Sequence, residues 1–567
     1  MTSMGQPYGL SAMLKDGHKH MSGLEEAVIK NLEACKQLAA ITRTSLGPNG
    51  MNKMVINHLE RLFVTSDTST IVTELEVAHP AANLIVMAAK AQEAEIGDGT
   101  NLVVSLAGEL LANAEALLRD GLHTTEIAEG YEKAAVKALE ILDSLVIPGT
   151  ESINMRSTEE VSSRIKGSVS SKQHGLEDVL CPLISKACID VCPENEKNFS
   201  VDNVRVAKLL GGGIHDSTVV RGMVLRRGVE NSITHVEDAK VAVFAQGVDT
   251  SSTDTKGTVL IKNAEELQNY SKSEEAKMEE IIKSIADSGC KAVVSGSSVG
   301  EMALHFCTRY GLMVVRIQSN FELRRFCRAT GAMALVKLQA PTPDELGFAK
   351  SIRVSEIGGS ACLLVEQDET MGQISTVVIR GSTENMMDDI ERAIDDGVNA
   401  YRALTKDPRC VPAGGATEIE MARQLAELAR KETGLGQYAF TKFCEALEVV
   451  PKTLAENSGH NATDVVSALY TAHAQGQTSM GVNVDEDGGL RDLAKEGILD
   501  LYATKWWAIK LAVDAVATVL RVDQIIMAKA AGGPKVPHMT PPTPSSFLPQ
   551  HIPSITVVGL ICWLNLP

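Results

Sequence analysis

The chain has 567 residues, of which 44% are hydrophobic, and it carries a formal net charge of −18. Because a single hydrophobic core stops growing at about 250–300 residues, this length predicts several domains, and the apolar content excludes a disordered chain. The acidic balance, with a pI near 5.3, disfavours a nucleic-acid partner. An aromatic content of only 4% also argues against a stacking platform for single-stranded nucleic acid.

The cysteines and the hydropathy pattern indicate a cytoplasmic protein. The 11 cysteines are odd in number and lie mostly in apolar runs, which is typical of reduced, buried thiols. Cys188 and Cys192 have no second pair at zinc-finger spacing, so we expect them on one helix face. No run reaches the roughly 18 apolar residues that a membrane span requires, and the N-terminus lacks the apolar core of a signal peptide. We therefore expect no membrane partner.

The first predicted element is a helix over residues 22–46. Ser22 and Glu25 have the spacing of a capping box, and apolar residues recur at helical spacing after them. The helix is expected to end before Gly47 and Pro48.

A short β-hairpin is predicted over residues 51–72, with turn residues near Asn57 and Ser66. Three helices follow in the prediction, at residues 80–95, 100–118 and 124–145. The first 145 residues are therefore expected to be mainly helical.

The pattern changes after about residue 150, where β-branched runs begin to alternate with helical patterns. This alternation predicts an α/β domain with partly parallel strands. The predicted strands are NVRVAKLL (203–210), AKVAVFAQGV (239–248), KAVVSG (291–296), LMVVRI (312–317), AMALVKL (332–338), ACLLVEQ (361–367) and STVVIRGS (375–382). The predicted helices between them are 276–288, 299–310 and 320–329. Helices return at 383–404 and 416–534, so the α/β segment is expected to be inserted into a helical domain made from both chain ends.

The last segment, residues 535–567, contains seven prolines, one lysine and no acidic residue. This composition predicts a disordered, Pro-rich tail, with an anchoring or docking tail as the alternative. Its terminal apolar run is about half the length of a membrane span.

The GDGTN motif lies between two predicted helices. Thr100 is expected to cap the helix that starts near Asn101, and a helix N-terminus attracts phosphate through its unpaired N–H groups. Gly97 and Gly99 leave room for an anion to approach the backbone. Since Asp98 would repel a bare phosphate, a bridging Mg²⁺ resolves the conflict. An ordinary Gly-rich turn is the alternative.

Other polar residues favour phosphoryl transfer over nucleophilic catalysis. The chain has no Walker-type phosphate loop, and LLGGGI (209–214) is expected to be a turn or hinge. Asp67 lies in the polar turn TSDTST. Asp389 and Asp396 share one side of a predicted helix, which by itself indicates a solvated face. No Ser/His/Asp or Cys/His set stands out, whereas separated acids with Gly-rich loops fit metal-assisted phosphoryl transfer.

Seven stretches, in chain order, resemble the group II chaperonins. They are TSLGPNGMNKMV, TSDTSTIV, ELEVAHPAA, GDGTN, VPAGGATEIEMA, LAENSGHNATDVV and WAIKLAVDAVATVLRVDQIIMAKAAGGPK. The last stretch, together with RGSTENMMDDIERAIDDGVNA and NVRVAKLLGGGI, is similar to one subunit type of the eukaryotic cytosolic chaperonin (TRiC, also called CCT). The resemblance covers about residues 5–536.

The resemblance implies a multidomain chaperonin fold. It consists of a mainly α-helical equatorial domain from both chain ends, an α/β intermediate hinge domain, and an inserted α/β apical domain with a lid protrusion near residues 249–276. The implied segments are equatorial 1–150 and 405–534, intermediate 151–218 and 371–404, apical and substrate-binding 219–370, and an atypical Pro-rich tail at 535–567.

The resemblance also implies an ATP-dependent molecular chaperone with Mg-dependent ATP hydrolysis, so ATP and Mg²⁺ are the expected cofactors. Subunits of the family form two stacked rings of eight, which implies seven paralogous chaperonin subunits as partners. They enclose non-native clients such as actin and tubulin in the cytoplasm by closing the lid. A structural ring subunit that binds nucleotide with little or no hydrolysis is one alternative, and a free monomeric nucleotidase is another.

Matches to the family motifs imply the site residues. Asp67 and Asp396 are implied to position and activate the attacking water, and Asp98 to hold the metal. The implied nucleotide-binding residues are Leu46, Gly47, Pro48, Asp98, Gly99, Thr100, Asn101, Ser170, Ser171, Lys172, Gly414, Gly415 and Asp500. The implied client-facing helix offers Phe321, Arg324, Arg325, Phe326 and Arg328.

The sequence departs from the family pattern beside these residues. Thr68 and Ala413 stand where the family usually has glycine. Both substitutions are expected to weaken nucleotide binding or to slow turnover, which favours the structural-subunit alternative.

Overall fold

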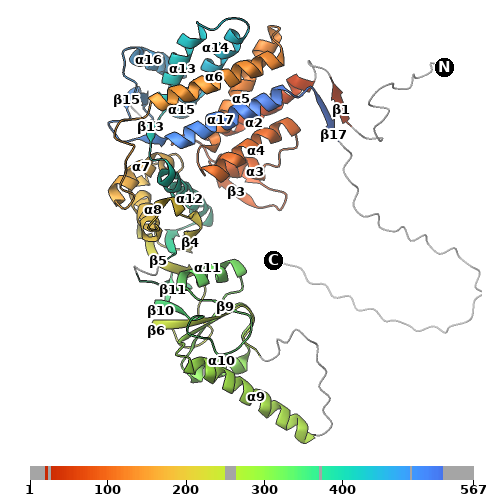
Figure 1. The fold of residues 1–567 in the computed structure, drawn as a ribbon, viewed down its shortest axis with the longest axis vertical. Coiled ribbons are helices and arrows are strands. Elements are labelled where there is room, and N and C mark those ends of the chain that lie inside the picture. Colours follow the sequence, from red (N-terminus) through yellow and green to blue (C-terminus); the bar gives the residue numbers. More distant parts are fainter. Residues whose placement is uncertain (1–18, 23–26, 250–263, 369–372, 486–487, 528–567) are drawn as a thin grey trace, which may run out of the picture. The chain divides into compact units, whose positions relative to one another are not determined.

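The computed structural model describes residues 19–22, 27–249, 264–368, 373–485 and 488–527 (Figure 1). The predicted tail, residues 250–263 of the predicted lid protrusion and Glu25 of the predicted capping box lie outside these residues. The described residues between 22 and 524 belong to one compact unit. In the terminal segments, β1 (Lys19–Ser22) and β17 (Gln524–Met527) pair in a two-stranded sheet.

The N-terminal part of the chain is mainly helical, as predicted. Its helices are α2 (Ile29–Arg43), α3 (Thr68–Glu74), α4 (Pro80–Glu95), α5 (Thr100–Arg119) and α6 (Thr124–Ser144). The predicted hairpin is the antiparallel pair of β2 (Lys53–Ile56) and β3 (Leu62–Thr65). The helix predicted over 22–46 is shorter among the described residues, because the chain already turns at Thr44. Helix α3 is absent from the prediction, since its β-branched residues favour a strand.

The C-terminal part is also helical. Its helices are α13 (Ala416–Ala429), α14 (Gly436–Leu447), α15 (Val449–Asn457), α16 (Ala462–Ala474) and α17 (Tyr502–Leu520). Two small antiparallel sheets accompany them: β13 (Cys410–Pro412) with β16 (Leu499–Leu501), and β14 (Met480–Val482) with β15 (Leu490–Asp492).

One hydrophobic core joins these two parts of the chain. Leu110 of α5 and Tyr131 of α6 are fully buried in the same cluster as Phe443 of α14 and Val516 of α17. The rings of Tyr131 and Phe443 lie 6.1 Å apart, and the Tyr131 hydroxyl donates to the carbonyl of Leu110 at 3.0 Å. Helices from the two ends of the chain therefore fold together around one core.

A second core is built from segments before and after the central sheet. Helices α7 (Thr158–Ser170) and α8 (Glu177–Val191) pack against α12 (Glu384–Lys406). Ile165, Ile184 and Ile394 are fully buried between them. Cys188 lies in α8 and is a buried free thiol, as expected, while Cys192 ends that helix. The short 3-10 helices are η2 (Glu196–Asn198), η3 (Val201–Asn203) and η4 (Ile214–Asp216).

A nine-stranded mixed sheet is formed by the middle of the chain. Its strands are β4 (Val204–Leu210), β5 (Thr218–Leu225), β6 (His235–Phe244), β7 (Ala292–Ser295), β8 (Met313–Arg316), β9 (Ala334–Leu335), β10 (Gly347–Ile357), β11 (Ser360–Glu366) and β12 (Ser375–Gly381). Their order is β4-β12-β5-β11-β10-β6-β7-β8, and β9 pairs with β6. Because β4–β12, β6–β7, β7–β8 and β6–β9 are parallel and the other pairs antiparallel, the predicted partly parallel pairing is confirmed.

The helices that alternate with these strands are α9 (Ala264–Asp287), α10 (Glu301–Arg309) and α11 (Asn320–Thr330). Strands β5 and β10 are absent from the prediction, because polar and charged residues interrupt their apolar pattern. The predicted strand at 332–338 shrinks to the two residues of β9.

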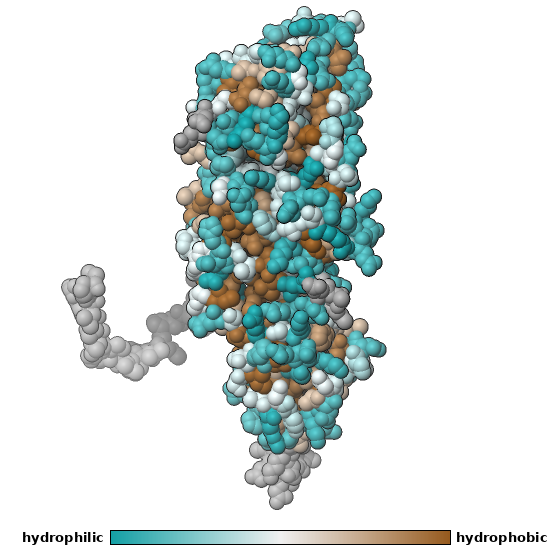
Figure 2. All heavy atoms as spheres, turned by 90° about the vertical axis from the view of Figure 1, so that its left-hand side faces the viewer, coloured by the Kyte–Doolittle hydropathy of each residue, from teal (hydrophilic) through white to brown (hydrophobic). Residues whose placement is uncertain are grey.

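By length and hydropathy, α5 is the one described helix that could cross a membrane. Val103, Leu106 and Leu111 of this helix are nevertheless almost completely buried in the core, so the protein itself covers its apolar surface. On the face drawn in Figure 2, hydrophilic side chains separate smaller apolar patches.

Candidate active site

The GDGTN motif forms a tight turn between α4 and α5. Gly97 and Gly99 have φ angles of +83° and +77°, in the left-handed region that favours glycine. A Cβ on Gly97 would overlap the side chain of Asn399, and one on Gly99 would lie 2.6 Å from Cγ2 of Thr504. Gly99, and not Thr100 as predicted, is the N-cap of α5, and it provides no side-chain cap. The helix therefore begins here with N–H groups that no capping side chain satisfies.

Asp98 is held from two sides. Its Oδ1 accepts a hydrogen bond from the backbone N–H of Gly99 at 2.6 Å, and its Oδ2 accepts one from the hydroxyl of Ser168 at 2.6 Å. Ser168 belongs to α7, so a distant part of the chain fixes the orientation of this carboxylate. A carboxylate has further lone pairs, which remain for a cation.

Asp67 precedes α3 and caps it. Its Oδ2 accepts hydrogen bonds from the backbone N–H of Thr70 at 3.0 Å and from the Thr70 hydroxyl at 2.6 Å. The predicted polar turn is therefore the start of a helix. The capping bonds occupy Oδ2, while Oδ1 faces an ion-pair partner, Lys172.

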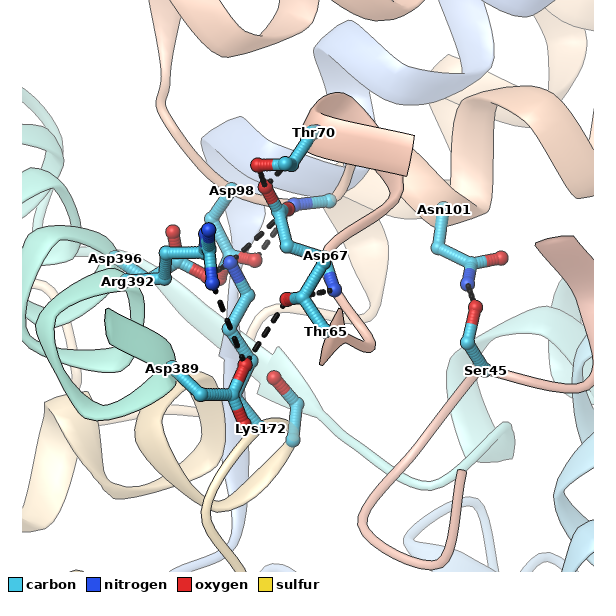
Figure 3. A network of polar contacts seen from close by, with 12 residues as sticks. Ser45, Thr65, Asp67, Thr70, Asp98, Asn101, Lys172, Asp389, Arg392 and Asp396 are labelled. Carbon is cyan, nitrogen blue, oxygen red and sulfur yellow. Dashed lines mark hydrogen bonds and ion pairs between the residues drawn. The ribbon is translucent and has the colours of Figure 1, made fainter. Parts of the chain in front are cut away.

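Lys172 joins two of the predicted acids (Figure 3). Its Nζ lies 3.1 Å from Oδ1 of Asp67 and 2.6 Å from Oδ2 of Asp396, and the three side chains are only 11%, 9% and 6% exposed. Lys172 follows α7, Asp67 precedes α3, and Asp396 lies on α12. The ion pairs thus connect three elements that are far apart in the sequence. The predicted Ser170 and Ser171 form the end of α7 directly before Lys172.

Burial and the neighbouring charges shift the pKa values of these groups. Burial raises the pKa of Asp396 well above its usual range; Lys172 opposes this effect, and Asp98 and Asp67 add to it. Burial also acts to raise the pKa of Asp67, but Lys172 and hydrogen bonds outweigh it, so this pKa is lowered. Burial acts to lower the pKa of Lys172, but the two aspartates outweigh it and the pKa is raised. Burial, followed by the charge of Asp67, raises the pKa of Glu93 to about 7.

Asp389 belongs to the same network. Its Oδ1 accepts a hydrogen bond from the hydroxyl of Thr65 at 2.9 Å, and its Oδ2 accepts one from Nε2 of Gln173 at 2.6 Å. The guanidinium of Arg392 lies 4.0 Å from Oδ1. Asp389 and Asp396 are both buried, so the prediction of a solvated face from their spacing is wrong. This face of α12 is buried against β3 and α7, which the helical period cannot reveal.

The turn after α2 contacts the start of α5. Asn101 donates from Nδ2 to the carbonyl of Thr42 at 3.0 Å and to the hydroxyl of Ser45 at 3.4 Å (Figure 3). The predicted residues of this turn are Leu46, Gly47 and Pro48. Two predicted nucleotide-binding loops are therefore neighbours, and Asn101 connects them.

Gly414 and Gly415 open α13 in the way that Gly99 opens α5. Their φ angles are +59° and +79°, and Gly415 is an N-cap without a side-chain cap. Asp500 lies in β16, which pairs with the strand that leads into this turn. The Oδ2 of Asp500 lies 2.9 Å from Nζ of Lys505.

Helix α17 links Asp500 to the GDGTN turn. Gln92 of α4 donates from Nε2 to the carbonyl of Asp98 at 2.8 Å and to the carbonyl of Thr504 at 3.3 Å. Thr504 directly precedes Lys505, the partner of Asp500. Asp500 and the GDGTN turn, which are both predicted to bind nucleotide, thus belong to one connected set of contacts.

The predicted client-facing residues lie on α11 and take no part in this network. Phe321 is 71% exposed, Arg324 and Arg328 are exposed, and Arg325 is half-buried. Phe326 is fully buried in the core beneath α11, so the prediction that it offers a surface to clients is wrong. The helix is amphipathic, and Phe326 lies on its inner face.

Comparison with known proteins decides the family. The model of the TCP-1/cpn60 chaperonin family matches residues 38–530. The chain belongs to this family. T-complex protein 1 subunit theta of Arabidopsis thaliana is 59% identical over 530 residues, covering 94% of this chain and 96% of that protein. The proteins of the same name from Homo sapiens and Dictyostelium discoideum are 53% and 50% identical, covering 93% and 94% of this chain and 96% and 99% of their own lengths.

Family membership confirms the resemblance to chaperonins. The relatives are theta subunits of T-complex protein 1. This is the subunit type to which the stretches NVRVAKLLGGGI, RGSTENMMDDIERAIDDGVNA and WAIKLAVDAVATVLRVDQIIMAKAAGGPK are similar. The chain is thus a chaperonin subunit, and its role as a molecular chaperone follows from its family. Chaperonins are in general ATP-dependent and hydrolyse ATP.

Several residues of the candidate site were missed by reasoning from sequence. Ser168 orients Asp98, and Gln173 holds Asp389. The only signal for them is their place next to the predicted SSK stretch. Glu93 lies one helical turn before Gly97, on the side of α4 that faces the acids, and nothing in its local pattern distinguishes it from a surface glutamate.

Proposed function

We propose that this chaperonin chain is an ATP-hydrolysing subunit of a hetero-oligomeric folding machine. Its relatives are named as subunits, which supports assembly with other chaperonin chains. The proposed assembly is a double ring of eight with seven paralogous partners in the cytoplasm. It encloses non-native polypeptides, such as actin and tubulin, by ATP-driven lid closure.

The proposed domains follow the cores of the fold. An equatorial domain over 1–150 and 405–534 is supported by the core that helices from both chain ends share. An intermediate domain over 151–218 and 371–404 is supported by the second core, which α7, α8 and α12 build. Residues 219–370 form the proposed apical domain, which contains most of the mixed sheet and α11.

The observation that carries the proposal is the meeting of Asp67 and Asp396 at Lys172. Three elements from distant parts of the chain bring these side chains within 3.1 Å of one ammonium group, beside the oriented carboxylate of Asp98. Buried charges at this density are expensive and need a compensating role. A hydrolytic site that has to hold a metal ion, a phosphate and a water is such a role.

The residues present fit a nucleotide. The uncapped N-terminus of α5, which begins after Gly99, favours phosphate oxygens, and α13 offers the same feature after Gly415. The hydroxyls of Thr68 and Thr504 are buried and have no hydrogen-bond partner among the described residues. Thr68 follows Asp67 in the chain, and Cγ2 of Thr504 lies beside Gly99, so both orphaned groups adjoin residues that we propose to bind the nucleotide.

Asp98 is the proposed ligand of Mg²⁺. Among the described residues, no group of three or more His, Cys, Asp or Glu side chains is arranged to hold a metal by itself. A single carboxylate suits Mg²⁺, which keeps several waters and takes its other oxygens from phosphates. Bound Mg-ATP supplies a polarised terminal phosphate as the group that water attacks.

Asp396 and Asp67 are the proposed catalytic acids. Asp67 is fixed by its capping bonds, so it serves to position a water. Asp396 has a raised pKa, which makes it a better proton acceptor than a surface aspartate once its pair with Lys172 loosens. Because Asp396 lies on α12 and Asp67 precedes α3, movement between these elements would switch the proton acceptor on and off.

Single-turnover ATP hydrolysis by assembled rings tests this proposal. Asp396→Ala in this subunit alone should remove one subunit's share of the ATP consumed. Asp388→Ala is the matched control, because Asp388 lies on the same helix but pairs with Lys208 at 2.5 Å, outside the site. Unchanged ATP consumption by the Asp396→Ala ring would exclude hydrolysis by this subunit.

Nucleotide binding is tested separately. Asp98→Ala should abolish measurable Mg-ATP binding in a calorimetric titration while the circular dichroism spectrum is unchanged, because the removed carboxylate is a metal ligand and only a small part of the packing. Binding equal to that of the unmodified chain would refute the role of Asp98.

The alternative is a structural subunit that binds nucleotide with little or no hydrolysis. Thr68 supports it, because its buried hydroxyl has no partner and stands next to Asp67, where the family has glycine. Thr68→Gly should then raise the single-turnover rate. A third candidate, a free nucleotidase, predicts elution of the native protein as one chain of about 60 kDa, whereas a ring elutes near a megadalton.

A further inference from the structure

A cavity lined by basic side chains lies apart from the acids of the hydrolytic site. Its volume is about 280 Å³, and β4, β5, β12 and α11 form its walls. Since a water in the liquid occupies about 30 Å³, the cavity has room for an ion much larger than chloride. Its charged lining consists of Arg205, Lys208, Arg226, Arg227, Glu322 and Arg325.

Three of the basic groups are already paired. Arg205 lies 2.8 Å from Asp202, Lys208 lies 2.5 Å from Asp388, and Arg227 lies 3.9 Å from Glu322. Of these acids, only Glu322 lines the cavity. The lining therefore carries five positive charges and one negative charge.

Two of the basic groups have no such compensation. Within the described ranges, neither Arg226 nor Arg325 makes an ion pair or a side-chain hydrogen bond. Arg205 has a buried Nε that finds no hydrogen-bond partner in the same ranges. Arg205 and Arg325 line the same cavity, so two like charges share one volume. Burial lowers the pKa of Arg205, and the charge of Arg325 lowers it further, while Asp202 and Asp395 oppose this effect.

We propose that this cavity is a binding site for a compact anion that carries several phosphate groups. Arginine side chains outnumber lysine four to one in the lining, and the planar guanidinium fork matches the oxygens of phosphate. The cations come from β4, from the segment that follows β5 and from α11, and they converge on one partly open pocket. A volume of about 280 Å³ suits a small polyanion better than an extended acidic peptide.

An anion bound in the cavity would strengthen the contact of α11 with the sheet. Helix α11 is tied to the segment before β4 by the hydrogen bond from Arg328 to Asn203, at 3.1 Å. The repulsion between Arg205 and Arg325 acts against this contact. An anion between the two guanidinium groups replaces repulsion by attraction, so α11 should be held more firmly on β4 and β5.

Calorimetric titration of the full chain with inorganic tripolyphosphate, in the absence of Mg²⁺, tests the site. The unmodified chain should show saturable binding that weakens between about 0.01 M and about 0.15 M salt, where the Debye length falls from about 30 Å to about 8 Å. The double variant that combines Arg226→Gln and Arg325→Gln should bind tripolyphosphate at least tenfold more weakly. The unfolding temperature of this variant should not fall, because the substitutions relieve repulsion.

A control variant separates the site from general surface charge. Arg324→Gln removes an exposed arginine of the same helix that does not line the cavity, and it should leave the affinity unchanged. The proposal is overturned by absence of saturable binding, by equal loss in Arg324→Gln, or by an acidic peptide that displaces tripolyphosphate at equal concentration.

Discussion

Removing Lys172 is expected to destabilise the folded chain strongly and in a pH-dependent way. Its ammonium group lies 3.1 Å from Asp67 and 2.6 Å from Asp396, and all three side chains are nearly buried. At an effective dielectric constant of about 20, opposite charges about 4 Å apart attract by about 4 kcal/mol. Lys172→Met leaves two buried carboxylates without their cation, and breaking a buried pair in this way costs about 3–5 kcal/mol.

The loss should become smaller at low pH. With Lys172 present, the pKa of Asp67 lies below its unfolded value, so its stabilisation is present at neutral pH and is lost only as pH falls through the folded pKa. Without Lys172, the pKa of Asp396, which burial already raises, rises further, and burial also raises the pKa of Asp67. The folded variant then binds protons that the unfolded chain does not, so its stability rises as the pH falls from neutral.

Urea denaturation of the full-length chain, followed by circular dichroism at neutral pH and at about pH 5, measures this effect; both values lie above the ordinary aspartate pKa of about 3.9. Lys166→Met is the matched control, because Lys166 is an exposed residue of α7 and such substitutions change stability by less than about 0.5 kcal/mol. An equal loss in both variants, or a loss at Lys172 that does not shrink in acid, would refute the reasoning.

Three further outcomes are expected from denaturation experiments. Gly415→Ala should destabilise by more than about 1 kcal/mol, because φ is +79° and Cβ would lie 2.9 Å from Pro451; Gly434→Ala, with φ +89° and open space, should cost less. Phe326→Ala should lower the free energy of unfolding by about 3–5 kcal/mol, because Phe326 is fully buried. Equal losses in the two glycine variants, or a loss at Phe326 no larger than at a surface position, would contradict these assignments. Glu420→Gln should lower the stability of the chain at neutral pH but not near pH 2. Burial acts to raise the pKa of Glu420, but hydrogen bonds, led by the one from His473, outweigh it and lower this pKa to about 2. A loss of stability that does not depend on pH would be contrary evidence.

The local pattern of the chain is sufficient to predict most elements near the site. Helices α4, α5 and α6 begin and end within one or two residues of their predicted bounds, because their apolar residues repeat at helical spacing over four or more turns. Helix α3 is not predictable in this way. It has only seven residues, and Asp67 rather than the residues inside it determines where it starts.

The position of the acids shows the limit of local pattern. Asp389 and Asp396 lie on a helix face that looks solvated in isolation, yet both are buried. The spacing of residues on one helix shows which of them share a face. It does not show what covers that face, because the partners, Thr65, Gln173 and Lys172, come from segments more than two hundred residues earlier in the chain.

The amino-acid sequence alone thus determined most of the elements, the chaperonin family and most of the residues to examine, since short-range periodicity, turn chemistry and seven motifs in order are local properties. Only the tertiary structure decided that Asp67 and Asp396 share one buried lysine, that Ser168 orients Asp98, and that Phe326 belongs to the core. The physical reason is burial: the energy of a charge or a ring depends on what surrounds it, and long-range packing supplies those surroundings.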